Sequence, residues 1–120
     1  MYTTYKLYIE ISKSVTLQVG KLGRFTFPKG FYMYTGSGKK NIIHRILRHF
    51  KKVKKLHWHI DYLLDNSFVE IKKIELCNED ECIVNKKVSG QVIVPGFGSA
   101  DCRNGCKSHL KLRNRSLTPR

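Results

Sequence analysis

The 120 residues suffice for one domain with one hydrophobic core, which excludes a second domain. Hydrophobic residues make up 41% of the chain, so it can fold without disulfides or a structural metal. Lys and Arg number 23 against 9 Asp and Glu, giving a formal net charge of +14. An excess of this size predicts a polyanionic partner, and we expect nucleic acid.

Hydropathy predicts the cellular location of the protein, and the location predicts the state of its cysteines. The sequence has no run of about 18 apolar residues, and residues 1–6 lack the charged-then-apolar order of a secretory signal. We therefore expect a cytoplasmic protein with no membrane partner. There the four cysteines would be reduced thiols or metal ligands rather than disulfides; they are Cys77, Cys82, Cys102 and Cys106.

The N-terminal third has the two-residue period of β-strands. One face of residues 5–11 carries Tyr5, Leu7, Ile9 and Ile11, which predicts a strand over this range. Residues 15–19 and 31–35 are also of β type, and the glycines and Pro28 between them mark turns. The pattern predicts an antiparallel unit.

A helix is predicted over residues 41–53. Its apolar positions follow the i, i+3, i+4 spacing of an amphipathic helix, and its other face is basic; these positions are Ile42, Ile43, Ile46, Leu47, Phe50 and Val53. Ser37 in the preceding Gly-Ser-Gly turn is a candidate cap. The alternative is that the helix start binds a phosphate through its backbone N–H groups.

Further along, we predict a helix over 58–64, a strand over 68–76 whose alternation slips at Lys72-Lys73, and a polar helix over 79–87. The mixture favours an α/β sandwich, a small sheet flanked by helices. Residues near the end lose periodicity and stay basic. We therefore expect a domain over 1–110 and a mobile basic tail over 111–120.

Arg45 and His49 lie four residues apart on the basic face of the predicted helix. At this spacing the two side chains are neighbours and can address one phosphate. Phosphodiester hydrolysis needs an activated water and stabilisation of the charge that develops on the phosphate oxygens. The alternative is that both residues, with Arg48 and nearby lysines, form a solvated face.

Several motifs resemble those of a known family. Tyr34-Thr35-Gly36, followed by a helix with Arg45 and His49, resembles the second half of the GIY-YIG nuclease motif, and Thr3-Thr4-Tyr5 stands where its first half would be. More closely, the chain resembles small archaeal and bacterial Uri-type endonucleases over nearly its whole length; the further segments are residues 57–63, Glu81-Cys82, 95–102 and 108–110.

The resemblance implies a three-stranded mixed or antiparallel sheet flanked by helices, and endonuclease activity, with DNA favoured over RNA. It implies catalytic roles for Tyr5, Tyr34, Arg45 and His49, and a role for Glu81 as the ligand of Mg²⁺ or Mn²⁺. Arg48 has no counterpart in the motif. Thr3 and Thr4 replace the usual Gly-Ile. The alternative is a nucleic-acid-binding module that has kept this fold and does not cut.

Two further groups contain metal-binding residue types. Cys102, Cys106 and His109, with Cys82 or Cys77 as a fourth donor, would suit a structural zinc site, although buried cysteines also pack as small apolar side chains, and we favour packing. For the segment containing His57, His59 and Asp61 we favour a structural role, because its apolar residues anchor it in the core.

Overall fold

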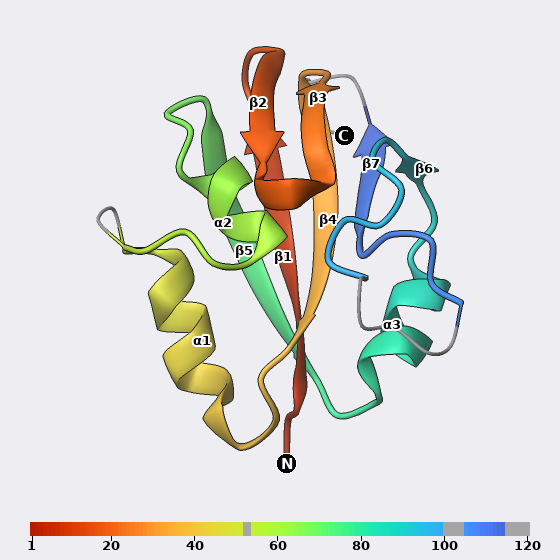
Figure 1. The fold of residues 1–120 in the computed structure, drawn as a ribbon. Helices are drawn as coiled ribbons and strands as arrows, with labels where there is room; N and C mark the ends of the chain where they lie inside the picture. The colour runs from red at the N-terminus through yellow and green to blue at the C-terminus, as the bar shows by residue number, and fades with distance from the viewer. Residues whose placement is uncertain (52–53, 100–104, 115–120) are drawn as a thin grey trace.

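The computed structural model describes residues 1–51, 54–99 and 105–114. Its main feature is an antiparallel sheet of five strands in the order β5-β1-β4-β7-β6 (Figure 1). The strands are β1 Thr4–Ile11, β4 Gly30–Ser37, β5 Val69–Cys77, β6 Gln91–Val92 and β7 Leu110–Asn114. The mixed α/β class is as predicted, but the expected number of three strands is wrong, because β7 and the two-residue β6 extend the sheet beyond β4.

A separate hairpin stands at the top of the molecule in Figure 1. It consists of β2 Val15–Val19 and β3 Gly23–Phe27, joined by the short 3₁₀ turn η1 Gly20–Leu22. Strand β2 was predicted, whereas β3 was not, because the glycines and Pro28 on either side of it read as turns. Gly20 has a φ of 49° and Gly23 a φ of 130°, and both values favour glycine.

Helices α1 Ile42–His49, α2 His59–Leu64 and α3 Glu81–Lys87 account for the three predicted helices. A 3₁₀ turn, η2 Lys39–Asn41, precedes α1. The prediction of a Ser37 cap is wrong, since Ser37 is the last residue of β4 and the α1 N-terminus has no side-chain cap. Strand β4 therefore runs almost directly into α1.

Helix α1 is shorter than predicted, and half of its predicted core face is exposed. Ile42 and Ile46 are buried, but Ile43, Leu47 and Phe50 are each more than half exposed. In Figure 1, α1 lies beside the lower part of the sheet, so only a narrow stripe of it meets the core. Val53 lies outside the described residues.

The core lies on the sheet face that carries Tyr5, Leu7 and Ile9. Buried side chains from α1, α2 and the hairpin cover this face, and among them Ile60, Leu63 and Phe27 are fully buried. Between β1 and β4, Leu7 pairs with Tyr34, and Tyr5 pairs with Gly36. The two motif tyrosines thus lie on neighbouring strands and on one face.

The predicted slip in β5 is confirmed. Tyr8 pairs with Lys73 and the next residue, Ile9, pairs with Ile71, which leaves Lys72 as an extra residue. This bulge keeps Ile71 and Ile74 packed against the core cluster on either side of the two lysines.

The segment predicted to be a tail begins inside β7. Leu110 and Leu112 are buried, so residues 111–114 belong to the sheet, and residues 115–120 lie outside the described residues. The alternation of two leucines with Lys111 and Arg113 spans too few residues to stand out in the sequence. None of the helices in the described part of the chain is long and apolar enough to span a membrane.

Candidate active site

Tyr5 on β1 and His49 in the last turn of α1 form the centre of the site. The Tyr5 hydroxyl lies 2.6 Å from His49 Nε2, and both residues are almost fully buried. The Tyr5 ring crosses β4 at Gly36, where an added Cβ would lie 2.5 Å from the ring. Glycine at this position of the Tyr-x-Gly sequence is therefore required by Tyr5.

Both members of this pair are neutral at pH 7, and burial reinforces this state. Burial raises the pKa of Tyr5 above its ordinary value, and Glu81 adds to the rise while Arg45 opposes it. Burial also lowers the pKa of His49 to about 4. The negative charge of Asp61 opposes this shift, and the positive charges of Lys54, Arg48 and Arg45 add to it. The contact is thus a hydrogen bond between a phenol and a neutral imidazole.

Tyr34 on β4 packs beside this pair. Its ring meets the His49 ring edge-on at 6.4 Å between centroids, and Gly98 leaves room for it, since a Cβ there would lie 3.1 Å from the Tyr34 ring. Burial raises the pKa of Tyr34 well above its ordinary value. Within the described part of the chain, no residue forms a hydrogen bond with the Tyr34 hydroxyl.

Arg45 lies one turn before His49 and is exposed. Its Nη1 donates to the Ser37 carbonyl at 3.0 Å, and its guanidinium lies 4.8 Å from the centre of the Trp58 ring. Trp58 also packs against the His49 ring, with the centroids 6.0 Å apart. Trp58 therefore positions both Arg45 and His49, a role that the apolar pattern of its segment did not indicate.

Arg48 and Arg45 have different roles. Arg48 Nη1 donates to Asp61 Oδ1 at 2.7 Å. The Arg48 guanidinium also lies over the Trp58 ring, 4.4 Å from the ring centre, so both arginines contact this side chain. Asp61 is fully buried and accepts hydrogen bonds from the backbone N–H groups of His57 and Trp58. These contacts give Asp61 a structural role, because it holds Arg48 and the start of α2.

His59 contacts the loop that packs against Tyr34. Its Nδ1 accepts a hydrogen bond from the Gly98 backbone N–H at 2.9 Å. Its ring also packs against Phe97, 5.7 Å away between centroids, and Phe97 in turn meets the Tyr34 ring edge-on. His59 therefore contacts Tyr34 only indirectly, through Gly98 and Phe97.

Glu81 is the first residue of α3, on a different element from the other candidate catalytic residues. Its side chain is 29% exposed, and its Oε2 lies 3.4 Å from His109 Nδ1. No hydrogen bond or ion pair within the described chain joins it to Tyr5, Tyr34, Arg45 or His49. Its charge nevertheless raises the pKa of both tyrosines, so the carboxylate lies within electrostatic reach of the phenols.

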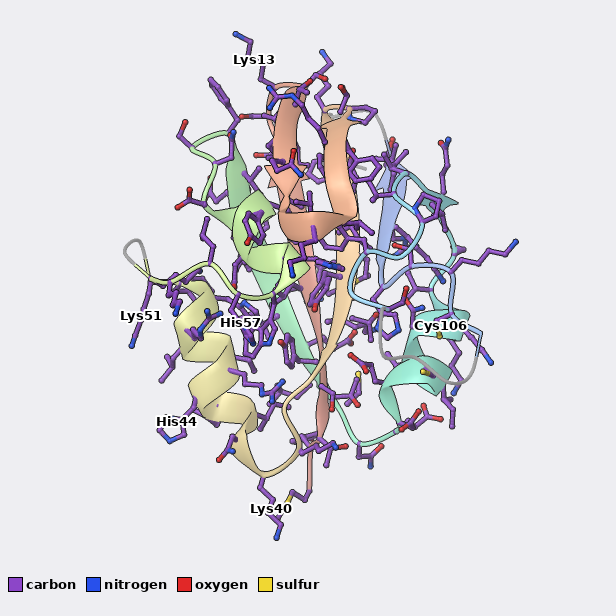
Figure 2. The ribbon with its side chains drawn as sticks, viewed as in Figure 1. Lys13, Lys40, His44, Lys51, His57 and Cys106 are labelled. Atoms are coloured by element: carbon purple, nitrogen blue, oxygen red, sulfur yellow. The ribbon has the colours of Figure 1, made fainter. Side chains whose placement is uncertain are left out.

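Three of the predicted zinc ligands come together beside Glu81. One donor atom each from Cys82, Cys106 and His109 lies within 4.8 Å of the others, so this cluster could bind a metal ion. Figure 2 shows Cys106 next to α3. Cys77, the alternative donor, is not part of the cluster, and Cys102 lies outside the described residues.

Residues 4–119 match the model of a protein family described as a domain of unknown function, DUF123. The chain belongs to this family. Comparison with curated proteins and with solved structures gave no match.

Proposed function

We propose that this DUF123 domain is a metal-dependent endonuclease that hydrolyses phosphodiester bonds in nucleic acid, with DNA as the favoured substrate. The observation that supports this most is the convergence of Tyr5, Tyr34, Arg45 and His49 from β1, β4 and α1. The net charge of +14 suits a polyanionic substrate.

Arg45 would bind the phosphate and stabilise its charge in the transition state. The guanidinium is exposed, and the Ser37 carbonyl and the Trp58 ring hold it in place. A guanidinium has five N–H donors in a planar fork, so the bond to Ser37 leaves donors for a phosphate. Because it is held before substrate binds, little reorganisation is needed during the reaction.

The Tyr5–His49 pair would carry the proton removed from the attacking water. A phenol with a raised pKa is a poor base by itself. Tyr5 can instead accept the proton from water while passing its own proton to His49 Nε2, 2.6 Å away. A bound phosphate adds negative charge near His49 and raises its pKa, so the imidazole becomes a better proton acceptor when substrate is present.

Glu81 would hold Mg²⁺ or Mn²⁺, which polarises a phosphate oxygen. These ions need hard oxygen ligands and are often bound by one or two carboxylates together with substrate phosphate and water. Glu81 fits this description, because its carboxylate is partly exposed and its charge reaches both tyrosines. Asp61 is unsuitable, since it is fully buried and paired with Arg48.

One observation favours the second candidate, a nucleic-acid-binding module on the same fold that does not cut. Burial raises the pKa of both phenols, so the unbound protein does not activate either tyrosine as a base. In such a module Arg45 and the surrounding lysines would bind phosphates, and the tyrosines would serve only as packing.

Labelled single-stranded, duplex and branched DNA and RNA, incubated with the protein and Mg²⁺, Mn²⁺ or EDTA, would distinguish the candidates. We expect scission with either metal, no scission with EDTA, and more scission of DNA than of RNA. Salt-sensitive binding without scission under any condition would favour the binding module. Absence of both binding and scission would contradict both candidates.

A further inference from the structure

We propose that Cys82, Cys106 and His109 bind a zinc ion that fastens the start of α3 to the segment leading into β7. The three side chains come from separate places, namely the first turn of α3, a loop, and the residue before β7. This site is separate from the oxygen-ligand site proposed at Glu81 and does not depend on nuclease activity.

The spacing of the donors suits zinc. Zn–S bonds of about 2.3 Å and Zn–N bonds of about 2.0 Å place the donors of a tetrahedral site roughly 3.5–3.8 Å apart. The three donors lie within 4.8 Å of one another, so they need to close by roughly 1 Å. Thiolate and imidazole ligands favour zinc over Mg²⁺ or Ca²⁺, which prefer oxygen.

The environment of His109 selects the nitrogen that would bind the metal. Nδ1 lies 3.2 Å from the Thr35 carbonyl oxygen and 3.4 Å from Glu81 Oε2, and both oxygens are acceptors when the carboxylate is ionised. Nδ1 therefore carries the proton, and the lone pair of the neutral ring is on Nε2. Metal-binding histidines are usually held in this way by a carbonyl or carboxylate on the other nitrogen.

Hydrogen bonds already fasten the opposite end of α3 to the segment before β7 and to β7 itself. Asn85 Nδ2 donates to the Ser108 carbonyl at 2.9 Å, and Lys111 Nζ donates to the carbonyls of Asn85 and Val88. At the start of the helix, Cys82 is buried and faces Cys106 and His109. A zinc ion there would provide the second point of attachment.

The zinc ion would also act on Glu81 without touching it. Glu81 precedes Cys82, and its carboxylate lies beside His109. If Cys82 and His109 were bound to zinc, the backbone that follows Glu81 and the imidazole beside its carboxylate would both be fixed in position. A structural metal would thereby hold the Glu81 carboxylate within electrostatic reach of Tyr5 and Tyr34.

The test begins with protein expressed in zinc-supplemented medium, purified without chelators and analysed for metal by mass spectrometry. We expect one zinc ion per chain. Replacement by Co²⁺ should give the intense visible bands of a tetrahedral site and a thiolate-to-cobalt charge-transfer band. These measurements use the wild-type chain, so they do not depend on the folding of a variant.

Variants then assign the ligands. Cys106→Ser and His109→Gln should weaken cobalt binding at least about tenfold, whereas Cys77→Ser, a half-buried cysteine outside the cluster, should leave it unchanged. Removing zinc from the wild type should lower its Tm and speed amide exchange in α3. The proposal is overturned if the wild type binds neither zinc nor cobalt, if Cys82 and Cys106 form a disulfide instead, or if Cys77→Ser loses as much metal as Cys106→Ser.

Discussion

The hydroxyl of Tyr5 lies 2.6 Å from Nε2 of His49, and neither side chain has more than 3% of its surface exposed. The two residues are 44 positions apart in the chain, so the contact fixes α1 against β1. Since each polar atom is removed from water, each depends on the other for its hydrogen bond. The two residues should therefore behave as a unit in both stability and chemistry.

The losses of unfolding free energy caused by replacing Tyr5 and His49 should not be additive. Tyr5→Phe leaves His49 Nε2 buried without the hydroxyl, and His49→Leu leaves the hydroxyl without the imidazole, so each should cost about 1–3 kcal/mol. The double variant should cost less than the sum of the two by roughly 1 kcal/mol. Urea unfolding of all four proteins at pH 7 measures this coupling, and strictly additive losses would show that the hydrogen bond contributes nothing.

Acid should destabilise the fold through His49. Its folded pKa of about 4 lies below the unfolded value of about 6.5, so the unfolded chain takes up the proton first as the pH falls. The stability of the neutral, buried imidazole is fully present above pH 6.5 and is lost as the pH falls toward 4. The difference corresponds to ~3 kcal/mol.

Urea unfolding between pH 7 and pH 4 tests this dependence. His49→Leu should flatten the curve in this window, while His59→Gln, whose imidazole is less buried, should flatten it less. Asp61 should contribute little, because hydrogen bonds from Arg48, Trp58 and His57 outweigh its burial and hold its pKa below the ordinary value. An unchanged slope in His49→Leu would contradict the prediction.

Much of the candidate site could be predicted from short-range patterns. Arg45 and His49 are neighbours because they are four residues apart in one helix. The prediction that both lie on the exposed basic face is wrong for His49, which is buried on the side of α1 that carries Ile46. Alternation in residues 5–11 placed Tyr5 on the inner face of a strand. The positions of Arg45, His49 and Tyr5 within their own elements depend on local periodicity, which the sequence carries directly. The pairing of Tyr5 with Gly36 also depends on the register between β1 and β4, which local periodicity does not determine.

Other features depend on contacts distant in sequence. Strand β6 has only two residues, and β7 forms by pairing with β4, so neither has a local pattern long enough to recognise. The exposure of Leu47 on a seemingly apolar face depends on where α1 meets the sheet. The Arg48–Asp61 ion pair distinguishes two arginines that look equivalent in sequence.

Gly36→Ala should destabilise the protein strongly. The added Cβ would lie 2.5 Å from the Tyr5 ring and 2.6 Å from its hydroxyl, so the ring would have to leave its position beside His49. We expect a loss of at least about 2 kcal/mol, in the range of overpacking in a core. In a Tyr5→Leu background, where the ring is absent, Gly36→Ala should cost less stability than it costs in the wild type. An equal cost in both backgrounds would mean that another contact is responsible.

Arg45→Ala should reduce cutting by about 10²–10³ in rate, as is typical when one preorganised donor to the transition state is removed. The fold should remain intact, since Arg45 is exposed. Arg48→Ala is not a fair control, because it breaks the ion pair with buried Asp61. Lys40→Ala is a better one, as this exposed lysine points away from the molecule in Figure 2 and carries the same charge. Equal loss in both variants would show that general charge is responsible.

Tyr34→Phe and Glu81→Gln should separate chemistry from packing. The Tyr34 hydroxyl makes no hydrogen bond with a described residue, so its removal should change stability by less than about 1 kcal/mol. If the hydroxyl acts on water or phosphate, the rate of cutting should still fall by about 10²-fold or more. Glu81→Gln keeps the shape of the side chain but removes its charge, so it should raise the Mn²⁺ concentration needed for cutting.

Binding of a non-cleavable duplex, measured alongside the cutting rate, provides the control for both variants. We expect affinity within a few-fold of the wild type, because the lysines and Arg45 supply most of the attraction to phosphate. The two variants should also differ from each other, since excess Mn²⁺ can restore Glu81→Gln but cannot replace the missing hydroxyl of Tyr34→Phe. Full cutting by Tyr34→Phe would reduce Tyr34 to a packing residue, and an unchanged Mn²⁺ requirement in Glu81→Gln would place the metal elsewhere.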